Sequence, residues 1–396
     1  MSSGLFGDLL VIDCASFIAG PAAATVLGDF GARVIKIEPP GIGDAYRNLF
    51  RLRGTPDDVD YFWTLDNRNK ESLSLDLGRP EARAVLHALV TRADVFITNV
   101  PMPARGRLGV RAQDLRPLNP RLIYASLSPY GEHGPERDRT GFDSTVWWAR
   151  SGLMDMVRPS AGAEPSLSMP GMGDHPTAMA MYGAIVTALY RRQLTGEGAE
   201  VTTSLLANGL WSNSCQVQAA LCGYELTGRP ARGARGALNE MYRAADDRYF
   251  IISSTNPARD WPLLARATGH ADWLTDPLFA TPEARLANGA ILVARFDETF
   301  AARPFAHWAK ILTEGDVTFG IVGQIYDHLG DEQIEANGLF PEIADGEGLR
   351  TVDSPFQIVG EAKAPPRMAP AIGAHTEALL RELGCSPAEV DALAAG

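Results

Sequence analysis

Little in this sequence of 396 residues points to disulfides, a metal centre or a membrane. Its four cysteines include no Cys-x-x-Cys pair, the spacing typical of zinc and redox sites. No apolar run reaches the roughly 18 residues that would favour a membrane span, and the first residues lack the basic and apolar parts of a secretion signal. We therefore expect a cytoplasmic protein with reduced cysteines in its core, no metal and no membrane partner.

Positive net charge is also lacking. The chain carries 48 acidic and 36 basic side chains, a formal net charge of −12. Nucleic acids and anionic membranes attract basic surfaces, so this charge argues against either as the main partner. An anionic small ligand would need a local basic site.

The Gly-x-Gly-x-x-Gly fingerprint of dinucleotide-binding proteins is missing from the turn at residues 16–21, although the topology around that turn fits one. Strands that alternate with helices favour an α/β fold, here a Rossmann-like doubly wound parallel sheet with its ligand crevice beyond the carboxyl ends of the strands. The predicted strands are residues 9–13, 33–38, 72–76, 95–98, 121–126 and 199–204.

The length exceeds that of one ordinary domain, and stretches with Gly, Pro and Arg indicate linkers. We expect a large Rossmann-like domain that the chain leaves and later re-enters, and a smaller α+β domain in between. The predicted boundaries are 1–222 for the first part of the large domain, 223–240 for a linker, 241–320 for the small domain, 321–335 for a second linker and 336–396 for the return.

Residues 171–176, Gly-Met-Gly-Asp-His-Pro, deliver one carboxylate to the start of a predicted buried helix at 177–190, which Gly196 stops. Asp174 would lie at or just before the helix N-terminus, where free N–H groups and the helix dipole favour its ionised form. Such a carboxylate can act as a nucleophile. The alternative is an ordinary N-cap with Pro176 in the first turn, and the motif alone leaves both open.

Several short stretches match one family pattern, collinear over nearly the whole chain and weakest in the middle. They are residues 19–21, 30–38, 69–70, 72, 75–76, 93–95, 99, 107–109, 119–123, 141–143, 173–174, 195–198 and 375–376. Taken together, these stretches resemble the family III CoA-transferases, a family that also contains α-methylacyl-CoA racemases.

The resemblance implies an enzyme that moves CoA from an acyl-CoA to a carboxylic acid, with Asp174 as its nucleophile. The carboxylate would attack the thioester to give a mixed anhydride, then an aspartyl-CoA thioester, which the acceptor acid resolves. CoA would be part of the substrate, and no further cofactor is implied. The family also implies a homodimer of interlocked chains, for which the linkers at 223–240 and 321–335 supply the reach.

The same resemblance implies where CoA is bound. Arg107 would meet a CoA phosphate and Asn99 the CoA amides, with a solvated arginine and an Asx-turn as the respective alternatives. Asp143 matches an acidic position beside the reaction centre. The full predicted set of CoA-binding residues is Ala19, Leu75, Asp76, Asn99, Ala104, Arg107 and Asp143.

Three positions depart from the family pattern. Val100 replaces an aromatic residue, and Pro39 stands where some relatives have a CoA-binding arginine. Phe142 stands where the racemase branch has an acid/base histidine, and a phenyl ring cannot transfer a proton. We interpret His175 as a polar residue of the helix start. We therefore predict an intermolecular CoA-transferase; the alternatives are an intramolecular CoA-transfer isomerase of a dicarboxyl-CoA, a 2-methylacyl-CoA racemase and a CoA-binding protein without activity.

The shape of the acyl pocket stays open. Trp147 and Trp148 would either pack in the core, as most tryptophans do, or line the pocket and favour a bulky or aryl acyl group. Arg150 could instead bind the second carboxylate of a dicarboxylate substrate.

Overall fold

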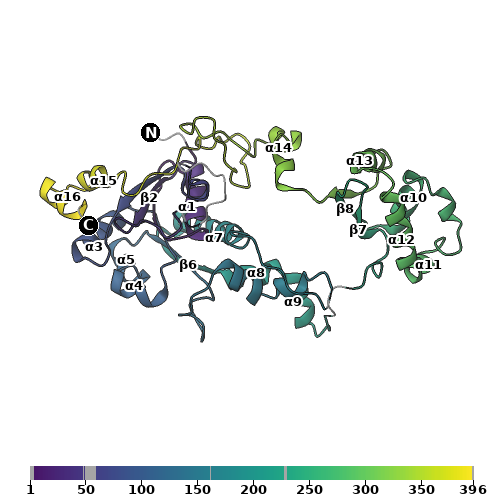
Figure 1. The fold of residues 1–396 in the computed structure, drawn as a ribbon. Helices are drawn as coiled ribbons and strands as arrows, with labels where there is room; N and C mark the ends of the chain where they lie inside the picture. Colours follow the sequence, from purple (N-terminus) through teal and green to yellow (C-terminus); the bar gives the residue numbers. More distant parts are fainter. Residues whose placement is uncertain (1–3, 48, 50–58, 161, 227–229, 395–396) are drawn as a thin grey trace. The chain divides into compact units, whose positions relative to one another are not determined.

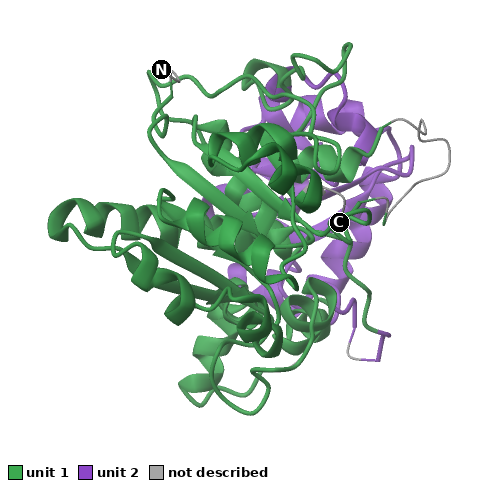
Figure 2. Ribbon diagram, turned by 90° about the vertical axis from the view of Figure 1, so that its left-hand side faces the viewer, with its two compact units in different colours: residues 1–157, 165–226, 335–396 green, residues 158–164, 227–334 purple. Residues whose placement is uncertain are grey.

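The computed structural model describes the chain except for residues 1–3, 48, 50–58, 161, 227–229 and 395–396. The chain forms two compact units (Figure 2). Unit 1 comprises Met1–Val157, Pro165–Leu226 and Glu335–Gly396, and unit 2 comprises Arg158–Glu164 and Thr227–Ile334. The chain thus passes between the units on both sides of residues 158–164 and again at 226–227 and 334–335. The last two passages lie within the predicted linkers 223–240 and 321–335, and residues 227–229 of the first linker lie outside the described residues.

Unit 1 is built on one parallel sheet of six strands in the order β3-β2-β1-β4-β5-β6. This is the doubly wound order, so the predicted α/β fold is confirmed. The order reverses between β1 and β4. The strands are β1 (Leu10–Cys14), β2 (Arg33–Glu38), β3 (Lys70–Ser74), β4 (Val95–Thr98), β5 (Ile123–Ser128) and β6 (Ala199–Ser204).

Helices cover both faces of this sheet (Figure 1). Successive strand residues point to opposite faces, so Val11 packs with α1 (Ala19–Asp29) and α7 (Asp174–Thr195), while Ile12 packs with the opposite layer. That layer contains α3 (Pro80–Val90), α15 (Thr376–Glu382) and α16 (Pro387–Ala394). The other helices of unit 1 are α2 (Tyr61–Asn67), α4 (Met102–Leu108), α5 (Ala112–Leu115), η1 (Arg116–Leu118), η2 (Asp143–Arg150), α6 (Leu153–Met156), α8 (Leu205–Ser212) and α9 (Ser214–Leu221).

Helix α7 ends at Gly196 in the left-handed conformation, as predicted. The expectation that the whole helix is buried is wrong. It buries one stripe, which includes Ala178, Met181 and Ile185 at helical spacing, while the side chains of Tyr190 and Leu194 are exposed. The small residues that suggested a buried helix instead let this stripe approach α1 closely.

Unit 2 combines a three-stranded antiparallel sheet with helices around an aromatic core that includes Tyr242, Phe250, Phe296 and Phe300. Its first strand begins at residue 239, within the predicted linker 223–240, and short helices occupy much of residues 325–336, which overlap the predicted linker 321–335. The elements are β7 (Asn239–Arg243), β8 (Tyr249–Ser253), α10 (Pro257–Ala267), η3 (Ala271–Leu274), α11 (Pro282–Ala287), α12 (Gly289–Phe300), α13 (Phe305–Glu314), β9 (Phe319–Ile321) and η4 (Ile325–His328); α14 (Glu332–Ala336) spans the second passage between units.

The returning segment, Glu335–Gly396, closes the free edge of the sheet at β3. The backbone N–H of Ser72 donates to His375 Nδ1 at 3.1 Å, and that of Ser74 donates to Thr376 Oγ1 at 2.9 Å. An edge strand presents backbone groups that can pair with another chain. Side chains of the tail occupy two of them here.

In the described part of the chain all four cysteines are free thiols, but only Cys14 is buried. Cys215 and Cys222 are exposed, because they lie in and just after α9, a helix of unit 1 that buries none of its residues. The expectation of four core thiols is therefore wrong for these two. Among the described helices, none combines the length and apolar character needed to cross a bilayer.

Candidate active site

A cavity of about 270 Å³ lies at the carboxyl ends of the central strands of unit 1. Parallel doubly wound sheets bind ligands at this edge, where the strand order reverses. The lining comes mainly from segments at the ends of β1, β4 and β5, together with the first residue of α7. It consists of residues 16–19, 99–102, 105, 127–129, 137–142, 174 and 205.

Asp174 is the first residue of α7 and lines this cavity. The N-cap position is taken by Gly173, so the interpretation of Asp174 as an ordinary N-cap is wrong. A side chain at Gly173 would meet the Trp147 ring at 2.6 Å, and Gly171 has a φ of 79°. Glycine is required at both positions, and the turn they form directs the carboxylate into the cavity.

The charge state of Asp174 differs from the expectation. Burial raises the pKa of its carboxyl group to about 7, and the negative charges of Asp143 and Asp66 add to this effect, while His175 opposes it. The helix terminus was expected to keep Asp174 ionised, but desolvation outweighs that influence. The raised pKa therefore places the ionisation of Asp174 near neutral pH.

His175 has a buried acidic partner that the sequence did not reveal. Its Nε2 lies 2.9 Å from Oδ1 of Asp66, whose side chain is only 2% exposed. The other carboxylate oxygen of Asp66 accepts a hydrogen bond from the Tyr46 hydroxyl at 3.2 Å. Burial lowers the pKa of His175, but the hydrogen bond and charge of Asp66 and the charge of Asp174 raise it more.

Asn99 joins the two strands that flank the reversal of strand order. Its Oδ1 accepts from the Ser16 N–H at 2.8 Å, and its Nδ2 donates to the Ser16 carbonyl at 2.7 Å. These bonds connect the segments that follow β1 and β4. The alternative of a local Asx-turn is wrong, because both bonds reach a residue 83 positions away.

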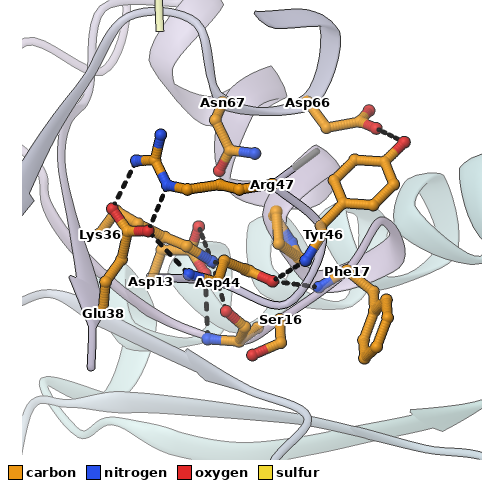
Figure 3. A network of polar contacts seen from close by, with 12 residues as sticks. Asp13, Ser16, Phe17, Lys36, Glu38, Asp44, Tyr46, Arg47, Asp66 and Asn67 are labelled. Carbon is orange, nitrogen blue, oxygen red and sulfur yellow. Dashed lines mark hydrogen bonds and ion pairs between the residues drawn. The ribbon is translucent and has the colours of Figure 1, made fainter. Parts of the chain in front are cut away.

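A buried network of charged side chains reaches the backbone of Phe17, a residue of the cavity lining (Figure 3). Lys36 Nζ lies 2.8 Å from Asp44 and 3.6 Å from Asp13, and Lys70 Nζ lies 2.8 Å from Asp13. Burial lowers the pKa of Lys70 to about 8 despite Asp13, whereas for Lys36 the attraction of Asp13 and Asp44 outweighs burial and raises the pKa. Asp44 also accepts from the N–H of Phe17 at 3.1 Å, which holds that residue at a φ of 64°.

Two phenyl rings meet within the cavity lining. Phe17 and Phe142 pack edge to face, with ring centroids 5.6 Å apart and an angle of 78° between their planes. Three arginines of the lining each have an acidic partner: Arg105 pairs with Glu132, Arg137 with Asp138 and Arg139 with Glu136. The two rings therefore offer aromatic surface to a ligand in the cavity that Asp174 also lines.

The cavity brings together three of the residues selected from the sequence, Asp174, Ala19 and Asn99. Asp143 adjoins them and accepts from the Gly173 N–H at 3.3 Å. The others are not among the described residues that line the cavity: Leu75 is in the core, Asp76 accepts from the Gly78 N–H, and Ala104 and Arg107 lie on α4. Contacts of all these residues with CoA remain predictions.

The residues considered for the acyl pocket lie elsewhere. Trp147 and Trp148 are 6% and 7% exposed and form a small core with Val146 and Leu205. The interpretation of both rings as core residues is therefore confirmed. Arg150 is exposed beside Glu136, at 3.7 Å.

The parallel sheet and its cavity define a ligand-binding α/β protein of the doubly wound class. Within that class, the chain belongs to CoA-transferase family III, whose family model matches residues 6–376. It is 30% identical to (R)-2-hydroxy-4-methylpentanoate CoA-transferase of Clostridioides difficile, over 96% of each chain, and 32% identical to acetyl-CoA:oxalate CoA-transferase of Acetobacter aceti, over 98% of this chain and 97% of the relative. The crystal structure of a CAIB/BAIF family protein from Brucella suis is similar with a TM-score of 0.85 and 27% identity, over 96% of this chain and all of that one.

Proposed function

We propose that this CoA-transferase moves CoA from an acyl-CoA donor to a free carboxylic acid and that Asp174 is the nucleophile. The placement of Asp174 carries the proposal, because it brings a partly ionised carboxylate into the switch-point cavity. The other carboxylate of the lining, Asp138, is half exposed and paired with Arg137. Of the two, Asp174 is the one available to react.

In the proposed reaction an oxygen of Asp174 attacks the thioester carbonyl, the C–S bond breaks, and a mixed anhydride and CoA thiolate form. The thiolate then attacks the aspartyl carbonyl, which gives an aspartyl-CoA thioester and releases the donor acid as its carboxylate. The acceptor carboxylate attacks that thioester and expels the thiolate again. The thiolate finally attacks the acceptor carbonyl of this second anhydride, so that the new acyl-CoA forms and Asp174 is regenerated.

The racemase alternative needs two titratable groups that flank the α-carbon of the substrate. Phe142 occupies the position of one of them and lines the cavity. His175 is adjacent to Asp174 in the chain, but its Nε2 is directed to Asp66. These observations favour CoA transfer over proton exchange.

We further propose that the acceptor is a carboxylic acid with an apolar or aryl side chain. The paired rings of Phe17 and Phe142 support this, because they offer apolar surface close to Asp174. A dicarboxylate would need a cation, and the arginines of the lining are paired with acidic side chains. Two relatives are named for acids of the apolar or aryl kind, 2-hydroxy-4-methylpentanoate and phenyllactate.

A substrate panel tests both proposals. Acetyl-CoA, succinyl-CoA and cinnamoyl-CoA are each incubated with 2-hydroxy-4-methylpentanoate, phenyllactate, oxalate or glutarate, and new CoA esters are measured by mass spectrometry. We expect the first two acids to react at least about tenfold faster than the two dicarboxylates, the discrimination typical of an apolar pocket. Equal or faster reaction of oxalate would contradict the proposed acid class.

Two further incubations separate the alternative reactions. A 2-methylacyl-CoA incubated with the enzyme in D₂O should keep its α-hydrogen. Rapid deuteration without any CoA exchange would establish the racemase instead. Movement of CoA within one dicarboxyl-CoA, without exchange into added acids, would establish the isomerase.

We also propose that the protein is a homodimer of interlocked chains. In unit 1, the segment of α8 and α9 and the residues just after it expose large apolar side chains: Trp211 is 79% exposed, Leu221 76% and Tyr224 71%. Large apolar side chains exposed along one segment support a protein partner, and a second copy of the chain is the partner that the family resemblance implies.

Sedimentation velocity tests this assembly. We expect a species of twice the 42.6 kDa chain mass that persists on dilution to nanomolar concentration, because interlocked chains cannot separate without unfolding. A species with the mass of one chain at micromolar concentration would refute the dimer.

A further inference from the structure

The imidazole of His175 faces a buried acceptor. Its Nε2 lies 2.9 Å from the carboxylate of Asp66. The Nδ1 edge of the ring lies so close to Gly171 that a side chain there would meet it at 3.0 Å. A ring nitrogen that faces a buried carboxylate favours the charged imidazolium, which donates from that nitrogen.

Asp66 is itself firmly anchored. Its carboxylate is buried and receives the Tyr46 hydroxyl. Its backbone carbonyl accepts from the Thr25 hydroxyl at 2.5 Å and from Lys70 Nζ at 2.9 Å. Figure 3 shows the link from Asp66 to the Tyr46 hydroxyl and from the Tyr46 N–H to Asp44, which belongs to the buried charged network. An acceptor fixed from several sides gives the histidine ring one preferred position.

We propose that Asp66 is a positioning residue for the nucleophile, which it serves by fixing a charged His175 ring beside Asp174. The titratable groups that act on Asp174 are Asp143 from η2, Asp66 from α2, and His175 on its own helix. Asp143 and Asp66 disfavour an ionised Asp174, and His175 is the cation that favours it. The inference rests on the proposed role of Asp174, and it assigns a task to Asp66, which is not among the described residues that line the cavity.

The substitution Asp66→Asn should shift the pKa of Asp174 in opposite directions in two backgrounds. In the wild-type protein, Asp66→Asn removes the partner that keeps His175 charged, so Asp174 loses its cation and its pKa should rise. In a His175→Gln background there is no cation to lose. There Asp66→Asn removes only a negative charge, and the pKa of Asp174 should fall. A purely structural contribution of Asp66 would move the pKa in the same direction in both backgrounds.

The pKa values are read by carbon NMR titration of protein labelled at the aspartate carboxyl carbon, with the Asp174 signal assigned through Asp174→Asn. No substrate is needed. In the wild-type background, Asp66→Asn should also move the acidic limb of the kcat/KM profile for the best donor and acceptor pair of the panel upwards. An upward shift of about one pKa unit lowers the rate about tenfold well below the pKa and leaves it nearly unchanged at alkaline pH. The matched control is Asp260→Asn, which removes a carboxylate that bonds Ser254 in unit 2.

The inference holds if the two backgrounds give shifts of opposite sign and the control gives none. It is overturned if the pKa of Asp174 moves in one direction in both backgrounds or does not move. A wild-type protein that shows this sign reversal but exchanges CoA with none of the panel acids would overturn the proposed catalytic use of the arrangement, and leave the electrostatic link between Asp66 and Asp174 standing.

Discussion

Replacing Asp174 with asparagine should abolish CoA transfer and leave the fold intact. The amide cannot attack the thioester or carry the acyl group, so we expect the rate of CoA ester formation to fall by about 10⁴-fold or more.

The same substitution should slightly raise the free energy of unfolding above neutral pH. The pKa of Asp174 is raised from 3.8 to about 7, so the stability that the protonated side chain contributes is complete below pH 3.8 and is lost as the pH rises through about 7. Asparagine avoids that loss, which thermal unfolding at acidic and alkaline pH will measure.

The matched control removes a first-turn carboxylate from another helix. Glu81→Gln in α3 should keep both the activity and the unfolding temperature of the wild-type protein. Hydroxylamine added with an acyl-CoA should modify Asp174, and peptide mass spectrometry will locate the label. A label on a different acidic residue, or normal turnover by Asp174→Asn, would show that another group is the nucleophile.

Lys70→Met should destabilise unit 1 more than any other change considered. Lys70 Nζ bonds the carboxylate of Asp13 at 2.8 Å and three further oxygens, from Pro21, Asp66 and Asn67. Without the ammonium, the carboxylate of Asp13 keeps Lys36 Nζ, at 3.6 Å, and the N–H of Ala15, at 3.1 Å. Removal of one partner from a buried ion pair typically costs about 3–5 kcal/mol, a large share of the roughly 5–15 kcal/mol that stabilises a whole domain. Urea unfolding followed by circular dichroism will measure the loss.

Two comparisons show whether the unpaired charge is the cause. Arg243→Met breaks the exposed ion pair with Asp247 and should leave the urea midpoint unchanged. Asp13→Asn combined with Lys70→Met removes both charges and should recover part of the lost stability. If Lys70→Met is no more harmful than Arg243→Met, the buried network does not support the fold in the way described.

The strands were predictable where one local signal dominates. Short apolar or strand-forming runs predicted β4 and β6 to the residue, at 95–98 and 199–204. The prediction for β3, residues 72–76, began two residues late, because the charged residues Lys70 and Glu71 do not continue the apolar pattern of the strand. Its ammonium is buried instead against Asp13 of another strand. Such pairing across a sheet has no counterpart in the local pattern of apolar residues.

The same distinction holds for the site. Asp174 could be selected because its glycines and its helix are neighbours in sequence. The partner of its neighbour His175 is 109 residues away, and the partner of Asn99 is 83 residues away. The helix dipole, a local property, predicted an ionised Asp174, and the opposing desolvation depends on segments that converge only in the folded chain.

The tail that closes β3 also determines how late in synthesis unit 1 can complete its folding. Ser72 and Ser74 leave the ribosome early, whereas His375 and Thr376, which occupy their N–H groups, follow only after all of unit 2 has been made. Throughout that interval the nascent chain carries an open sheet edge, a template for pairing with a neighbouring nascent chain. Unit 2, by contrast, lies almost entirely in one stretch, Thr227–Ile334, and can fold as soon as that stretch has emerged. Chaperone binding during translation is therefore most valuable at the earliest-made half of this protein, even though its sheet is the better buried of the two.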